Sequence, residues 1–139
     1  MLTWIIAGSL AIAAPGLKDP PKPKAPVGRF TIDRWEVDGV VVNRPDLASY
    51  VMRHEATSVT LELNGRDVKS ETVTFSEAGG VGQADFRSED GSPAKKAIWK
   101  LEGDTLTICE SEAGGERPTD FSSGHGSKRT LWVLKRIKD

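Results

Sequence analysis

The feature that most constrains the fold is a two-residue alternation of apolar and polar side chains. Trp99 and Leu101 lie two positions apart, the run 102–104 is typical of a turn, and Leu106 and Ile108 follow at the same spacing. A period of two places successive side chains on opposite faces of an extended strand. We therefore predict a β-hairpin over residues 97–109.

The same alternation recurs from residue 28 to the end of the chain. Asn64-Gly65, a strong hairpin signal, separates two of the strand-like runs. A change of phase near Asp33-Arg34 predicts a β-bulge. The segment 46–52 is the best helical candidate, although it is too short for a stable helix. The expected strands cover 28–37, 40–42 after a turn at Asp38-Gly39, 59–63, 68–75, 83–86, 97–101, 105–109 and 130–137.

Short strands joined by hairpin turns favour one architecture over the others. They predict an all-β fold, a small antiparallel up-and-down meander that closes into a barrel of about eight strands. About 110 residues are available for it, which is enough for one hydrophobic core without metals or disulfides. We assign this domain to residues 28–139.

Two segments precede the strands. Residues 1–14 are apolar and too short to span a bilayer comfortably, and they contain Ala11-Ile12-Ala13, a pattern that signal peptidases accept. We predict a signal peptide here, although no Lys or Arg precedes the apolar run; a buried N-terminal strand or helix is the alternative. Residues 15–27 form a Pro-rich linker. The protein is then periplasmic or secreted, and it is not an integral membrane protein after signal cleavage.

The charge pattern argues against several classes of partner. The 19 basic and 20 acidic residues are interspersed along the chain. Nucleic-acid binding and polybasic membrane binding both need concentrated positive charge, so we expect neither.

Few residues suggest catalysis or metal binding. His54 and His125 are the only histidines, and their spacing from Cys109 does not match a structural zinc site. Cys109 is the only cysteine, so no internal disulfide is possible, and we interpret it as a half-buried structural thiol. A Cys109–His125 dyad is the remaining catalytic alternative, which would make the protein a hydrolase. We predict no catalytic residue, no metal site and no cofactor.

Three motifs in the last third of the chain carry a family resemblance. They are the strand–turn–strand 101–109 ending in Cys109, the segment Arg117-Pro118-Thr119-Asp120-Phe121, and the terminal strand 131–136. Together they resemble an uncharacterised family of exported planctomycete domains. That family opens with Gly-Thr-Trp, whereas this chain has Gly28-Arg29-Phe30. The resemblance implies a lipocalin-like barrel and no known activity.

The resemblance also marks motif residues, namely Cys109, Arg117, Pro118 and Phe121. We interpret them as structural. Pro118 stiffens the loop, Arg117 bonds carbonyls or a carboxylate such as Glu116 or Asp120, and Phe121 plugs one barrel end. An Arg117 that binds a ligand at the barrel mouth is the alternative.

Aromatic residues on the predicted strands suggest a function. They either fill the core or line an apolar pocket with a polar mouth. Our first hypothesis is a non-catalytic barrel that binds a small apolar ligand. The second is a cell-envelope module that presents the long loop 110–128 to a protein or glycan partner. The ligand-binding candidates are Trp35, Phe75, Phe86, Trp99 and Arg117.

Overall fold

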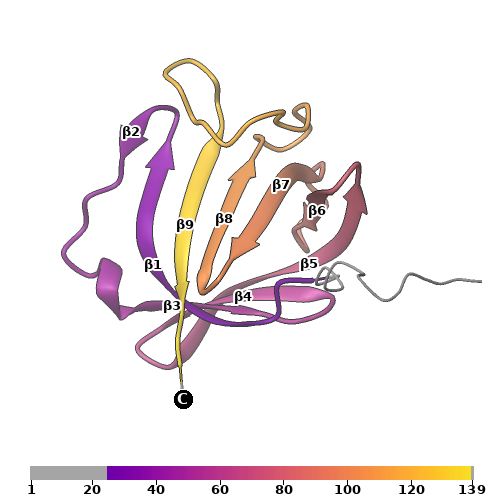
Figure 1. The fold of residues 1–139 in the computed structure, drawn as a ribbon. Helices are drawn as coiled ribbons and strands as arrows, with labels where there is room; N and C mark the ends of the chain where they lie inside the picture. The colour runs from indigo at the N-terminus through magenta and orange to yellow at the C-terminus, as the bar shows by residue number, and fades with distance from the viewer. Residues whose placement is uncertain (1–24, 139) are drawn as a thin grey trace, which may run out of the picture.

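The computed structural model describes residues 25–138, so the predicted signal peptide and most of the predicted linker lie outside the described residues. Within that range the chain forms one β-sheet and a single short 3-10 helix (Figure 1). The elements are β1 Gly28–Val37, β2 Val40–Val41, η1 Leu47–Ser49, β3 Tyr50–His54, β4 Ser58–Leu63, β5 Arg66–Ala78, β6 Val81–Arg87, β7 Lys95–Glu102, β8 Thr105–Glu110 and β9 Thr130–Arg136.

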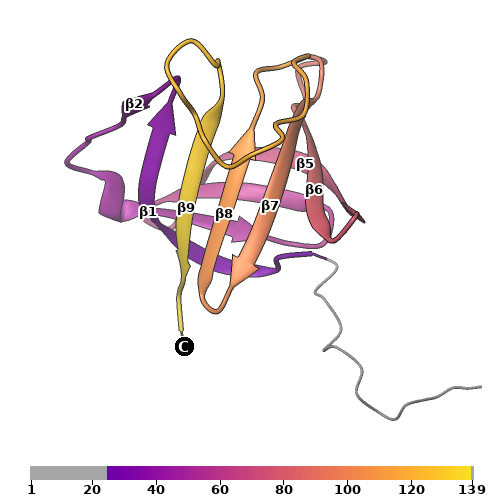
Figure 2. The same ribbon diagram turned by 45° about the horizontal axis from the view of Figure 1, so that its top comes forward.

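The strands form an antiparallel meander that closes on itself. The order in the sheet is β2-β1-β3-β4-β5-β6-β7-β8-β9, and β1 also pairs with β9. Eight strands therefore make a closed barrel, with β2 added beside the second half of β1. β1, β9, β8 and β7 run side by side and cross β3, β4 and β5 at a steep angle (Figures 1 and 2). The predicted all-β, lipocalin-like barrel is confirmed.

Local details of the sequence pattern are also confirmed. β7 and β8 form the predicted hairpin, with Glu102 paired to Thr105 across Gly103, whose φ is +61°. Glycine suits this corner because side chains disfavour positive φ. The pairing of β1 with β9 shifts register between Ile32 and Arg34, where the bulge was predicted.

The helical candidate over 46–52 forms no α-helix, in line with its short length, and its second half belongs to a strand that was not predicted. Only Leu47–Ser49 forms a single 3-10 turn, and the chain is extended from Tyr50 to His54. A strand here pairs with both β1 and β4, which satisfies more backbone groups than an isolated short helix could. As a consequence, Met52 and His54 become buried residues of the barrel.

One end of the barrel interior is closely packed. Phe30, Leu106 and Leu134 are completely buried there. The Trp99 ring lies across Gly82 so closely that a Cβ at that position would overlap it. Its indole N–H donates to the carbonyl of Gln83 at 3.1 Å, so the one polar atom of this ring is satisfied. Phe30, Trp99, Leu106 and Leu134 belong to a hydrophobic core cluster that also includes residues toward the other end of the barrel.

Within residues 25–138, no helix has the length and apolar character needed to cross a membrane.

Candidate functional site

The other end of the barrel is hollow. A cavity of about 370 Å³ lies inside it, and exposed Val37 and Lys69 on its border show that it opens to solvent. Nine of its lining residues carry apolar, aromatic or hydroxyl side chains, and five carry ionisable ones. The lining comprises Trp35, Val37, Met52, His54, Val59, Leu61, Lys69, Glu71, Phe86, Lys95, Ile108, Glu110, Thr130 and Trp132.

Two tryptophans form one wall of this cavity. Trp35 on β1 and Trp132 on β9 are direct cross-strand partners in the seam that closes the barrel. Their rings stack with centroids 4.7 Å apart and planes 12° from parallel. Offset aromatic pairs of this kind are stabilised beyond their buried area. The wall is therefore a flat, rigid aromatic surface facing an open space.

A buried charge cluster is set into the cavity lining. The Lys95 ammonium lies 3.3 Å and 3.2 Å from the two carboxylate oxygens of Glu71 and 3.6 Å from Oε1 of Glu110. The Trp132 indole N–H donates to the same Oε1 atom at 3.3 Å. The three charged side chains come from β7, β5 and β8, so the pairing of the successive strands β5 to β8 brings them together. Ser88 donates to Glu71 from the surface side.

The surroundings shift the ionisation of this cluster. Burial raises the pKa of the Glu110 carboxyl, against the opposing effects of Lys95 and of the Trp132 hydrogen bond. For Lys95, burial lowers the pKa of the ammonium, but the charges of Glu110 and Glu71 outweigh burial and raise it above its ordinary value. Lys95 is therefore held as a cation between two acidic groups.

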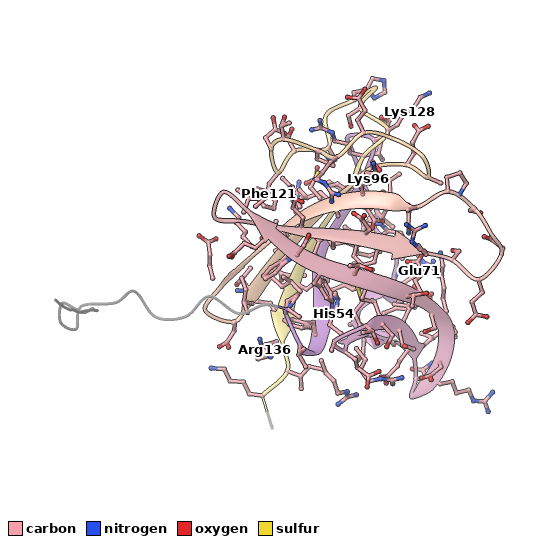
Figure 3. All side chains as sticks on the ribbon, turned by 90° about the vertical axis from the view of Figure 1, so that its right-hand side faces the viewer. His54, Glu71, Lys96, Phe121, Lys128 and Arg136 are labelled. Atoms are coloured by element: carbon pink, nitrogen blue, oxygen red, sulfur yellow. The ribbon has the colours of Figure 1, made fainter. Side chains whose placement is uncertain are left out.

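His54 is the most unusual polar group of the cavity. It is 1% exposed and packs edge-to-face on Phe30, with ring centroids 5.4 Å apart (Figure 3). Among the described residues, neither of its ring nitrogens has a hydrogen-bond partner. Burial lowers the pKa of His54 to about 4, so the ring is neutral at pH 7.

The indole nitrogen of Trp35 is likewise buried and without a partner among residues 25–138. An unsatisfied buried polar group costs about 1–3 kcal/mol. Both orphan groups belong to residues that line the cavity. The described residues thus leave two buried polar groups unsatisfied at this end of the barrel, a cost that the satisfied Trp99 indole avoids at the other end.

Of the five predicted ligand-binding residues, two line the cavity and three do not. Trp35 and Phe86 line the cavity. Phe75 and Trp99 instead pack edge-to-face, with centroids 6.2 Å apart, and belong to the hydrophobic core. Arg117 is not among the residues that line the cavity.

Arg117 anchors the β8–β9 loop to the outside of the barrel. Its guanidinium donates to the carbonyls of Ala84 at 3.1 Å and Ala97 at 2.9 Å, and to the Asp85 carboxylate at 2.7 Å. Bonding to carbonyls is the role predicted from the sequence, but the carboxylate is Asp85 and not Glu116 or Asp120. The guanidinium is thus used by contacts within the fold.

The predicted plug of the barrel end by Phe121 is wrong. Phe121 packs against Ile98, Cys109 and Leu131, which alternate with the inward-facing residues of β7, β8 and β9 and so face outward. The Lys100 ammonium lies 4.8 Å from the Phe121 ring centroid. The physical reason is that these outward positions are apolar, so the loop gains more by covering them. Figure 2 shows the loop in front of the ends of these strands.

Cys109 is fully buried under this loop and not half-buried as predicted. Its thiol donates to the carbonyl of Ser122 at 3.4 Å. Burial raises the pKa of the Cys109 thiol to about 11, which disfavours the reactive thiolate. Pro118 is fully buried as well. These motif residues therefore hold the loop in place.

Sequence reasoning missed the polar members of the cavity, although a signal for them was present. Glu110 lies two residues after inward-facing Ile108, Lys95 lies four before inward-facing Trp99, and Glu71 lies two before buried Val73. Continued alternation by two would have placed all three inside. Glu110 was assigned to the loop 110–128, and Glu71 and Lys95 were not considered as interior residues, because charged residues usually lie at the surface.

Comparisons with known proteins give no further guidance. No protein-family model, no curated protein and no solved structure matches this chain. In the described part of the chain, no group of three or more potential metal-ligating side chains is placed to hold a metal ion.

Proposed function

We propose that the protein is a non-catalytic binding module that holds a small apolar ligand inside its barrel. The observation that carries this proposal is the cavity of about 370 Å³ with aromatic walls. Ligand sites commonly have volumes of about 300–1,000 Å³, a mostly apolar lining and a few polar groups. An engineered cavity of about 150 Å³ already binds benzene, so a larger ligand fits here.

The side chains that could perform chemistry favour binding over turnover. The Cys109 thiol is buried on the outer face and has a raised pKa, so it is a poor nucleophile. Lys95 is held protonated by its neighbours. His54 is neutral, and no side chain or backbone group within residues 25–138 bonds its ring nitrogens to orient them for proton transfer.

An interaction module that uses the 110–128 loop is the alternative function. Arg117 and Phe121 fix this loop on the barrel, which supports its use as a rigid surface. Deletion of residues 111–116 should then abolish capture of a partner, and unchanged capture would contradict it. The cavity favours the first function, because an unfilled interior needs a reason that a loop surface does not supply. Export to the periplasm or medium stays a prediction.

The binding function can be tested with N-phenyl-1-naphthylamine, a neutral apolar fluorophore. We expect its fluorescence to rise on binding, with quenching of the tryptophans that line the cavity. The Val59→Trp variant fills the cavity and should weaken binding at least tenfold, because Val59 lines it.

Val68→Trp is the matched control, since Val68 is 52% exposed and lies outside the cavity. Circular dichroism would establish that both variants fold. Lack of uptake by the unmodified protein, or equal uptake by both variants, would overturn the proposed function.

A further inference from the structure

The acidic and basic groups inside the cavity are unequal in number, and this imbalance narrows the ligand class. The inference rests on the proposed function, because it concerns the same cavity. The buried cluster contains two carboxyl groups, Glu71 and Glu110, and one ammonium, Lys95. Their side chains are 12%, 10% and 23% exposed. Charges this far removed from water are weakly screened and dominate the field inside the cavity.

The other ionisable residues of the lining do not restore the balance. Lys69 is exposed at the border of the cavity, where water screens its charge. His54 is neutral at pH 7. The interior therefore has acidic groups in excess of its one buried cation.

Only one of the two carboxylate oxygens of Glu110 is used by contacts within the described residues, which leaves the other for a ligand. Both of its contacts, with Lys95 and with the Trp132 indole, are made by Oε1. The second oxygen, Oε2, belongs to a side chain that lines the cavity. A carboxylate oxygen accepts charge-assisted hydrogen bonds, which are about twice as strong as neutral ones. An ammonium group on a ligand is the donor that suits it best.

The aromatic wall beside Glu110 strengthens this preference. Trp132 donates to Glu110 and stacks on Trp35, so indole surface lies directly beside the carboxylate. Organic cations are attracted to aromatic faces, and tryptophan is the best of these. The remaining wall, which includes Met52, Leu61 and Phe86, offers contacts for a hydrocarbon body.

We propose that the cavity selects small amphipathic amines, with the ligand ammonium at Glu110 Oε2 and the apolar body against the tryptophan wall. A carboxylic acid of the same size would place a negative charge beside Glu71 and Glu110. A neutral alcohol would gain neither attraction nor repulsion. Affinity should therefore fall from amine to alcohol to carboxylate.

The test is a competition series against bound N-phenyl-1-naphthylamine at pH 7. The competitors are decylamine, decanol and decanoate, which share a hydrocarbon chain and differ in head group. We expect decylamine to bind at least tenfold more tightly than decanol, and decanoate to bind most weakly. The advantage of decylamine should shrink as salt is added, by less than for a surface ion pair.

Substitutions assign the effect to the cluster. Glu110→Gln should remove the advantage of decylamine and leave the affinity for decanol within about twofold. Glu77→Gln is the matched control, because Glu77 lies on β5 with Glu71 but is exposed. If Glu110→Gln does not fold, Glu71→Gln replaces it, and the head-group ranking of the unmodified protein is decisive by itself.

The outcomes separate the two proposals. If the fluorophore binds but decanoate competes as well as decylamine, or if none of the three competes, the amine preference is overturned and the binding function stands. If the fluorophore itself does not bind, the proposed function fails and the ligand class fails with it. The amine proposal is supported by the expected ranking, together with the loss of that ranking in Glu110→Gln where this variant folds.

Discussion

The two ends of the barrel interior are built from the same strands and yet differ in what they can do. β8 supplies Leu106 to the packed end and Glu110 to the hollow end, and β9 supplies Leu134 and Trp132 in the same way. At the packed end the side chains fill the space, and the one indole nitrogen has its partner. At the hollow end, charged groups and orphan nitrogens surround an opening. Alternation thus decides which residues face inward, and their size and polarity decide whether the interior is core or cavity.

Removing the same side chain from each end should expose this difference most strongly. Leu106→Ala creates a void in a closed core, so we expect it to lower the free energy of unfolding by about 3–4 kcal/mol. Leu61→Ala only enlarges an existing cavity and should cost about 1–2 kcal/mol. Leu106 is completely buried, and Leu61 is half-buried in the cavity lining. Urea unfolding measures both values, and equal losses would mean that the hollow end is packed in solution.

Acid should weaken the hollow end through His54. Its pKa is lowered by burial from 6.5 to about 4. Between these pH values the unfolded chain binds the proton and the folded protein does not, so stability falls as the pH falls through this window. The full effect approaches about 3 kcal/mol.

The control for this pH effect is His54→Phe, which removes the titrating group and the orphan nitrogens while keeping an aromatic ring beside Phe30. Its stability should vary less between pH 7 and pH 4, and at pH 7 it should be at least as stable as the unmodified protein. Chemical unfolding at several pH values gives both curves. Identical pH dependence in the two proteins would show that His54 is not buried neutral.

The smallest effect is expected from exchanging the tryptophans. Trp99→Phe loses a hydrogen bond and packed volume, so it should cost about 1–2 kcal/mol. Trp35→Phe removes an indole nitrogen that has no partner among the described residues and keeps a ring for stacking, so stability should stay within about 0.5 kcal/mol. Thermal unfolding compares them. A larger loss for Trp35→Phe would mean that its indole N–H is satisfied in solution.

The strands and turns of this barrel were predicted from the sequence better than the residues that meet inside it. The hairpin at Gly103 and the bulge near Arg34 followed from local patterns, because turns and phase changes are properties of neighbouring residues. β3 was missed, since Tyr50 to His54 shows no clean alternation and its strand character comes from pairing with β1 and β4.

The candidate site was harder to predict because it is assembled from distant strands. Trp35 and Phe86 were correctly placed on strands, but nothing local distinguishes them from Phe75 and Trp99, which face the packed end. The meeting of Lys95 with Glu71 and Glu110 depends on the pairing and register of β5 to β8. No single segment of the sequence indicates which side chains on different strands will come into contact.

The seam between β1 and β9 determines when the cavity can form during folding. The bond from the Thr31 hydroxyl to the Lys135 carbonyl spans 104 positions, and the stacked tryptophans belong to the same seam. Contacts of such long sequence separation form late and slowly during folding. Half of the aromatic wall lies on β9, the last strand of the barrel in chain order. The cavity is therefore complete only in a molecule whose β9 has paired with β1.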